Sequence, residues 1–301
     1  MTTTRRTGRP STAAKTERRF ALLMSTPGTL VILAVTIFPL LYAFYFSFTN
    51  YQLGFAGQVR FVGLVNYLKA LGDGRFWSDL LNTGLLVVGG VAAQLTLGML
   101  IALILNAIRH GRAFALSLML IPVVISPIVA GWQGRMLLND QYGPLNAILR
   151  SIGLNPPSWL ADPHVSLLSI FLIDTWQWTP FMALILLAAL QGISSELLDA
   201  AQVDGASGST IFWKIILPII TPTLMVAVLI RAVDAFKTFD LVYLLTSGGP
   251  GSSSETISFL TYLQGFQFFN VAYAAAMAFI QLFIVSVLAS QFIKYMQRGQ
   301  P

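Results

Sequence analysis

Long apolar stretches alternate with shorter polar segments along the chain, and this pattern predicts membrane-spanning helices. A helix needs about 20 mostly apolar residues to cross roughly 30 Å of hydrocarbon. The stretches that reach this length predict six spans, at about 22–48, 83–107, 113–134, 165–190, 215–245 and 271–296. We therefore expect an all-α, polytopic membrane protein with six transmembrane helices.

A polar, basic tail precedes the first apolar stretch. It carries six of the 18 Lys and Arg residues, namely Arg5, Arg6, Arg9, Lys15, Arg18 and Arg19. A cleavable signal peptide has a shorter apolar region and a small-residue cleavage site, whereas this stretch ends in the aromatic run 42–48. We expect residues 1–20 to form a cytoplasmic tail, disordered over residues 2–16, and residues 21–301 to form one transmembrane domain.

The basic residues also predict the orientation in the membrane. With the N-terminus inside, the inward segments are 1–21, 107–112, 191–214 and 294–301, and they hold eleven of the 18 Lys and Arg residues. Because short cytoplasmic loops carry an excess of Lys and Arg, this distribution predicts that both termini lie in the cytoplasm.

Composition excludes a soluble protein. The chain is 55% hydrophobic and 10% charged, with a mean hydropathy of +0.73, whereas soluble domains carry roughly 25% charged residues. The net charge of +6 is concentrated ahead of the first span, where basic residues face membrane lipid, so we expect no nucleic-acid partner. There is no cysteine, and hence no disulfide and no thiolate metal site.

The inward segment 191–214 predicts two short helices joined by a turn. Ser194 or Ser195 can cap the first helix, and Glu196 lies in its first turn, where a negative charge favours the positive end of the helix dipole. Gly205 then permits a sharp bend before the second helix. On this evidence alone, the pair could be an interfacial connector with no further role.

The residue pattern of this segment matches a known motif. Asp199-Ala-Ala, three residues, Gly205, nine residues, and then Ile215-x-Leu-Pro218 resembles the EAA loop of binding-protein-dependent ABC transporter permeases. Asp204, directly before Gly205, fits the form usual in the sugar-importer subfamily. The family's motif begins with Glu, so Asp199 is a departure that shortens the acid by one methylene.

The resemblance extends along most of the chain. Segment 61–67 (FVGLVNY) is similar to the stretch that precedes the permease domain in these sugar permeases, and Phe76-Trp77 with Asn82-Thr83 resembles the entry to their second span. Segment 244–250 (LLTSGGP), followed by Glu255-Thr256, is similar to their loop after the fifth span. The tail and much of 135–164 have no diagnostic match.

The resemblance implies a mechanism and a set of partners. In that family two homologous permeases form the path in a bacterial-type inner membrane, and each inserts its EAA loop into a cytoplasmic ATPase. A solute-binding protein delivers the solute from outside. The resemblance implies that ATP and Mg²⁺ bind two separate ATPase subunits and that this chain carries no cofactor. It implies Glu196, Asp199, Ala200, Ala201, Asp204, Gly205 and Pro218 as the residues that couple to the ATPase.

Ionisable residues within the predicted spans are the candidates for the path, because such residues are costly at bilayer depth and usually face a cavity or a partner. Asp174 lies in the fourth span. Arg231 and Asp234 lie three apart in the fifth, so they share one helix face and can pair, and Lys237 and Asp240 repeat this spacing.

Two interpretations of these polar residues remain open. They can be structural pairs, or they can line a polar path for a sugar, which presents hydroxyls at its edge and C–H groups on its face. The candidate path residues are Asp174, Trp176, Trp178, Arg231, Asp234, Phe236 and Phe239, with the four aromatic rings as stacking surfaces.

No catalytic constellation or metal cluster is evident. His110 and His164 lie far apart in the predicted topology, and Gly248-Gly-Pro-Gly251 is not followed by the Lys-Ser/Thr of a phosphate-binding loop. We therefore expect a permease subunit of an ATP-driven carbohydrate importer rather than an enzyme. The alternatives are an importer subunit for glycerol-3-phosphate or glycerophosphodiesters, or an ion-coupled secondary transporter that works alone.

Overall fold

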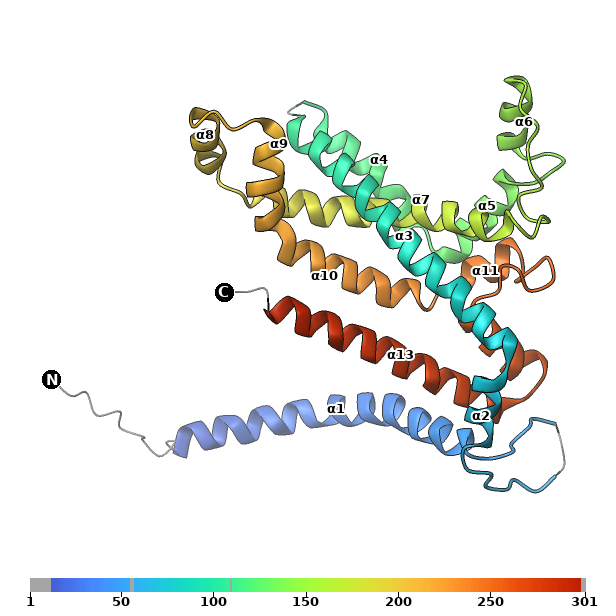
Figure 1. Ribbon diagram of the computed structural model, residues 1–301. Coiled ribbons are helices and arrows are strands. Elements are labelled where there is room, and N and C mark those ends of the chain that lie inside the picture. The colour runs from blue at the N-terminus through green and yellow to red at the C-terminus, as the bar shows by residue number, and fades with distance from the viewer. Residues whose placement is uncertain (1–11, 55–56, 109, 299–301) are drawn as a thin grey trace.

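The computed structural model describes residues 12–54, 57–108 and 110–298, and these form helices joined by short connections (Figure 1). The elements are α1 (Thr12–Ser47), α2 (Val65–Gly72), α3 (Gly74–Ala107), α4 (Arg112–Val124), α5 (Pro127–Leu137), α6 (Pro144–Ser151), α7 (Ser166–Gln191), α8 (Ser195–Val203), α9 (Gly208–Ile211), the π-helical η1 (Phe212–Ile216), α10 (Leu217–Ala235), α11 (Asp240–Leu245), α12 (Ile257–Tyr262), the π-helical η2 (Leu263–Gln267) and α13 (Val271–Arg298). Among the described residues the only β-type pairing is an isolated bridge between Thr49 and Phe61. The predicted all-α class is confirmed.

Within the described part of the chain, five helical stretches are long and apolar enough to cross a membrane: Leu23–Ser47, Gly74–Ala107, Ser166–Gln191, Gly208–Ala235 and Val271–Gln297. They correspond to the predicted first, second, fourth, fifth and sixth spans. The first helix begins at Thr12, before the predicted span and within the stretch expected to be disordered. Arg5, Arg6 and Arg9 of the predicted tail lie outside the described residues.

The third predicted span is a broken helix. α4 and α5 meet at an angle of 96°, so residues 113–134 do not form the single straight helix that hydropathy predicted. Ser126 has extended backbone dihedrals, and its side chain caps α5 by accepting from the Val129 amide at 3.4 Å. Pro127 follows at the first helical position, where its missing N–H costs nothing. Ile125 and Ser126 therefore end one helix and start another.

The fifth predicted span is shorter than expected. α10 ends at Ala235, and residues 236–239 form a turn in which the Lys237 and Thr238 amides bond to carbonyls three residues earlier, at 3.0 and 3.1 Å. The Thr238 carbonyl accepts from the Thr256 hydroxyl at 3.0 Å, which ties this turn to the start of α12. Residues 240–245 then form the separate helix α11.

The helices pack most closely where α3 crosses α7. A Cβ atom at Gly98 would lie 2.8 Å from the Met182 Cβ, so only glycine permits this approach of the two backbones. Small residues at such crossings are typical of membrane helices, because packing rather than the hydrophobic effect drives their association. One core cluster, including Leu105, Leu186 and Ile220, lies towards one end of α7, and another, including Ile170 and Leu241, lies towards the other.

The start of α3 is clamped to the segment before α12. Arg75 forms a bidentate ion pair with Glu255, at 2.7 and 2.8 Å. The Asn82 side-chain amide donates to the backbone carbonyl of Glu255 at 3.0 Å. The Thr83 hydroxyl accepts from the backbone amide of Ile257 at 3.0 Å. Two segments that are far apart in the sequence thus meet at one end of the bundle.

Candidate functional site

A buried cluster of charged and polar side chains lies where α3, α7 and α10 meet. Arg231 of α10 places Nη2 at 2.6 Å from both carboxylate oxygens of Asp174 on α7, and Nη1 at 3.0 Å from Oδ2 of Asp234. Its Nε donates to Oε1 of Gln94 on α3 at 2.9 Å, and the Gln94 Nε2 donates to Asp174 at 2.8 Å. The Trp178 ring lies 4.9 Å from the guanidinium carbon.

The cluster satisfies its own charges. Arg231 is 1% exposed, and every nitrogen of its guanidinium has a partner, while Asp174 accepts from both Arg231 and Gln94. A buried ion costs several kcal/mol unless a partner of opposite charge and further hydrogen bonds compensate it. Asp234 differs, because 53% of its side chain is exposed. The cluster is therefore closed on the Asp174 side and open on the Asp234 side.

The predicted pairing of Arg231 with Asp234 is confirmed, and the structure adds two partners. Asp174, which the sequence indicated as a separate polar position, lies in the same cluster. Gln94 was not singled out, although a glutamine within an otherwise apolar span is the signal that could have identified it.

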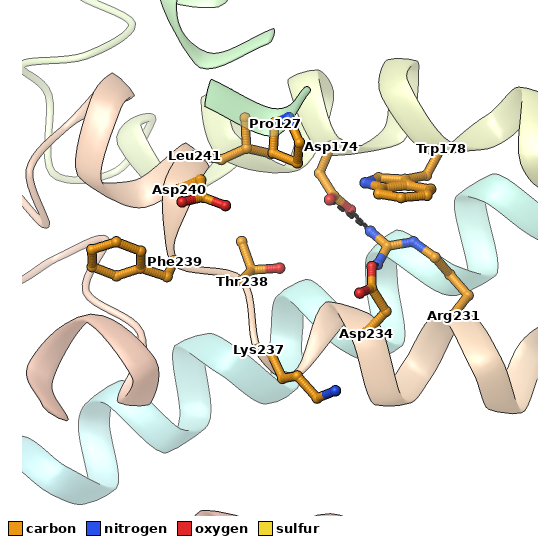
Figure 2. A pocket seen from close by; sticks show the side chains of 10 residues that line it. All are labelled: Pro127, Asp174, Trp178, Arg231, Asp234, Lys237, Thr238, Phe239, Asp240 and Leu241. Carbon is orange, nitrogen blue, oxygen red and sulfur yellow. Dashed lines mark hydrogen bonds and ion pairs between the residues drawn. The ribbon is translucent and has the colours of Figure 1, made fainter. Parts of the chain in front are cut away.

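A cavity of about 230 Å³ adjoins this cluster (Figure 2). Its walls come from the start of α5, from α7 and α10, from the turn 236–239 and from the start of α11. The lining residues are Pro127, Asp174, Trp178, Arg231, Asp234, Lys237, Thr238, Phe239, Asp240 and Leu241. The volume is below the roughly 300–1,000 Å³ of a typical ligand site.

Two of the four predicted stacking rings line this cavity, and two do not. Trp178 and Phe239 are lining residues. Trp176 is 43% exposed, and it points elsewhere because residues two apart on a helix face directions about 200° apart. Phe236 is 6% exposed and packs in a core cluster with Ile257 and Leu260. The expectation that Trp176 and Phe236 stack beside the others is therefore corrected for this cavity.

The remaining polar lining residues come from the turn after α10. Lys237 and Asp240 do not share a helix face, because α10 has ended before them. Among the described residues, neither forms an ion pair. The cavity therefore presents three carboxylates and two cations, of which Arg231 already has a partner at each guanidinium nitrogen. The lining groups outside these buried bonds are Lys237, Asp240 and the exposed side of Asp234.

A second feature, the α8–α9 pair, projects from the opposite end of α7 from α6 (Figure 1). α8 ends in a Schellman motif, in which the Gly205 amide bonds to the Gln202 carbonyl and the Ala206 amide to the Ala201 carbonyl, each at 3.0 Å. Gly205 has a φ of +79°, which confirms the predicted bend. Ser194 precedes α8 without forming the predicted side-chain cap, whereas Ser207 accepts from the Thr210 amide at the start of α9.

Most of the predicted coupling residues are on the surface of this pair. Glu196, Asp199, Ala200, Asp204 and Gly205 are exposed, as is Pro218 in the first turn of α10. Ala201 is the exception at 8% exposed. α9 runs through the π-helical η1 directly into α10, which carries Arg231. A displacement of the pair would therefore act on the helix that lines the cavity.

Comparison with known proteins identifies the family. Residues 94–299 match the model of the family described as "Binding-protein-dependent transport system inner membrane component". The chain belongs to this family. The match covers α8, α9, the Arg231 cluster and the cavity, because every residue of these features lies within this range.

Individual relatives cover nearly the whole chain. It is 35% identical to a probable ABC transporter permease protein of Sinorhizobium fredii, over 96% of each chain. It is 34% identical to the trehalose/maltose transport system permease protein MalF of Thermococcus litoralis, over 94% of this chain and 95% of that one. The fold resembles a bacterial ABC transporter involved in import of the acidic polysaccharide alginate, with a TM-score of 0.82, 21% identity and coverage of 95% and 98%.

Membership in the family defines the class of protein. This chain is a multi-pass inner membrane component of a binding-protein-dependent transport system, and it is not an enzyme. The remaining questions are how it takes part in transport and which solute it passes.

Proposed function

We propose that this chain is one of two homologous permeases that together form the translocation path of an ATP-driven carbohydrate importer. Two cytoplasmic ATPase subunits bind ATP and Mg²⁺, and a solute-binding protein delivers the solute from outside the cell. The polar cavity beside the Arg231 cluster is the observation that carries the proposal, because it is a polar space bounded by candidate spans.

The α8–α9 pair supports ATP-driven coupling. It is exposed, it is closed by the hydrogen bonds of the Schellman motif at Gly205, and it continues through η1 into α10. Two short helices fixed in this way transmit a displacement better than a flexible loop does. In this proposal the α8–α9 side is cytoplasmic, both termini lie in the cytoplasm, and Glu196, Asp199, Ala200, Ala201, Asp204, Gly205 and Pro218 form or support the contact with the ATPase.

The charges of the cavity support an uncharged polyhydroxyl solute. Carboxylates outnumber cations, each nitrogen of the Arg231 guanidinium already has a partner, and the remaining groups can donate to or accept from hydroxyls. Trp178 and Phe239 offer rings to the C–H face of a sugar. The relative named for trehalose/maltose transport points to the same class of solute.

An anionic solute such as glycerol-3-phosphate is the second candidate. It is favoured only by Lys237, whose ammonium forms no ion pair among the described residues. Arg, rather than a lone Lys, is the usual means of binding a phosphate bidentately, and the one Arg here is engaged. The relative named for sulfoquinovosyl glycerol transport, 29% identical to this chain, shows why the question needs an experiment.

The test is solute uptake into proteoliposomes that contain the complete complex. The partner solute-binding protein is first screened by thermal shift against maltose, trehalose, glycerol-3-phosphate and sulfonated sugars. We expect stabilisation by a neutral sugar and ATP-dependent uptake of that sugar. Stabilisation by anionic solutes alone would overturn the carbohydrate assignment, and uptake without ATPase subunits would overturn the importer assignment.

A further inference from the structure

A small lobe at the opposite end of α7 from α8 has a defined internal structure that transport through the cavity does not explain. It consists of residues 139–160 and contains α6. The Trp159 ring nitrogen donates to Oδ1 of Asn146 at 2.7 Å, and the Asn139 side chain accepts from the Gln141 amide at 2.9 Å. Gly143 is required where the chain doubles back, because a Cβ there would lie 2.3 Å from the Asn139 carbonyl oxygen.

The end of α6 is equally well defined. The Gly153 amide bonds to the Arg150 carbonyl at 3.1 Å and the Leu154 amide to the Leu149 carbonyl at 2.9 Å, which together form a Schellman motif. Gly153 has the positive φ, +81°, that this motif needs. Leu145, Trp159 and Leu160 pack against the core cluster that includes Ile170 and Leu241. The lobe is therefore a fixed structure attached to the bundle.

α6 is amphipathic, and only part of its apolar face is covered. Leu145, Ile148, Leu149 and Ile152 lie on one side of the helix at three- and four-residue spacing, whereas Ala147 and Arg150 lie on the other. Leu145 faces the core, but Ile148 is 60% and Ile152 66% exposed. This exposed edge carries aliphatic side chains and no charge.

The position of α6 relates this edge to the membrane. α6 lies between α5, the second half of the broken span, and α7, a candidate span. In Figure 1 it is drawn crosswise to α7 and α13, near the level at which those helices start. A helix that lies across the spans at their ends is placed where a bilayer surface meets the protein. Tyr142, 70% exposed, adds an amphipathic ring of the kind that favours this zone.

We propose that α6 is an interfacial helix that rests on the bilayer surface on the side opposite α8, with Ile148 and Ile152 directed at the lipid. An uncharged aliphatic edge suits acyl chains. The lipid would cover the two isoleucine side chains that the helix bundle leaves exposed, and burial of this apolar area favours membrane binding. A soluble protein that docks transiently would meet a more mixed surface, since such interfaces are about as polar as the rest of a protein surface. α6 thereby fixes the lobe between α5 and α7 against the membrane.

The experiment measures the depth of nitroxide labels. The chain has no cysteine, so single-cysteine variants place a label in this chain at one position only. Ile148→Cys and Ile152→Cys test the apolar edge, and Ala147→Cys on the exposed opposite face is the matched control. The labelled full-length chain is assembled with its partner subunits in phosphatidylethanolamine–phosphatidylglycerol vesicles, and collisions with oxygen and with a water-soluble nickel chelate are compared.

We expect the oxygen-to-nickel collision ratio to be several-fold higher at 148 and 152 than at 147, without any solute-binding protein present. Equal ratios at all three positions would overturn the proposal. So would labels at 148 and 152 that are open to nickel in vesicles and become protected only when loaded binding protein is added, because α6 would then be a protein-docking surface.

Discussion

The Arg231 cluster and the α8–α9 pair are held together by opposite means. The cluster joins three helices through side chains that are mostly buried, and its bonds connect residues far apart in the sequence. The α8–α9 pair is exposed, and its defining bonds are between backbone groups a few residues apart. One region depends on the packing of the bundle, and the other largely on its own sequence.

This difference separates stability from coupling. A change in the cluster leaves a buried charge or donor without a partner, so its first effect is on the folded state. A change on the exposed pair leaves no buried group without a partner, and we expect it to act mainly on contacts with another subunit. The predictions below begin with the largest expected loss of stability, in the cluster, and then move to the exposed pair and the cavity.

Replacing Arg231 is expected to cause the largest loss of stability. Arg231→Met leaves the buried Asp174 carboxylate uncompensated, which costs about 3–5 kcal/mol. Thermal unfolding of the purified chain in detergent measures the effect. Adding Asp174→Asn should recover much of the loss, because it removes the orphaned charge. An Arg231→Met variant that melts with the wild type would contradict the account of the cluster.

Asp234 is the control within the same cluster. It bonds to Arg231 at 3.0 Å, but its side chain is 53% exposed. Asp234→Asn should therefore cost at most about 1 kcal/mol, the usual value of an exposed ion pair. A loss of stability as large as that of Arg231→Met would show that Asp234 contributes as much to folding as the buried Asp174 side of the cluster does.

Replacing Gln94 should have an intermediate effect. Gln94→Leu removes the acceptor of the Arg231 Nε and one donor to Asp174, and an unsatisfied buried group costs about 1–3 kcal/mol. Thr96→Val on the same helix is the matched control, because Thr96 is exposed and its hydroxyl bonds only within α3. Equal melting temperatures for the two variants would argue against a structural role of Gln94.

Gly205→Val separates coupling from stability. The positive φ of Gly205 costs a β-branched residue about 1–3 kcal/mol locally, while no atom lies within 4 Å of a Cβ there. We expect normal membrane insertion and complex assembly, with uptake lost. Gly153→Val introduces the same strain at φ +81° in the α6 lobe and should keep uptake. Normal uptake by Gly205→Val would refute the coupling role of this loop.

Lys237→Gln should leave stability almost unchanged, since the Lys237 side chain is exposed and forms no ion pair among the described residues. For a neutral sugar we expect uptake to fall a few-fold, with KM rising more than the maximal rate falls. Complete loss of uptake, restored by Lys237→Arg, would instead indicate that the cation holds an anionic solute.

The sequence predicted what depends on neighbouring residues. The bend at Gly205, the pairing of Arg231 with Asp234 and most spans follow from local spacing, and the structure agrees with them. Ser126-Pro127 was also a local signal for a new helix, but continuous hydropathy across residues 113–134 outweighed it. The 96° bend was missed for that reason.

Contacts between helices could not be predicted in the same way. The bonds of Asp174 and Gln94 to Arg231 depend on how α3, α7 and α10 cross, and no spacing within one helix encodes that. Which of the candidate rings line this cavity could not be predicted either, because membership of a polar segment does not say which side of a helix faces it: Trp178 and Phe239 do, and Trp176 and Phe236 do not.

The central claim is that ATP hydrolysis by separate ATPase subunits changes the conformation of this chain, and that this chain does not transport the solute without them. The most direct measurement is ATP hydrolysis by the complete complex in proteoliposomes, with and without the solute-loaded binding protein on the outer side. We predict that the loaded binding protein stimulates hydrolysis and that solute accumulates only when ATP is present. Accumulation by this chain alone, driven by an ion gradient and without the ATPase subunits, would contradict the account.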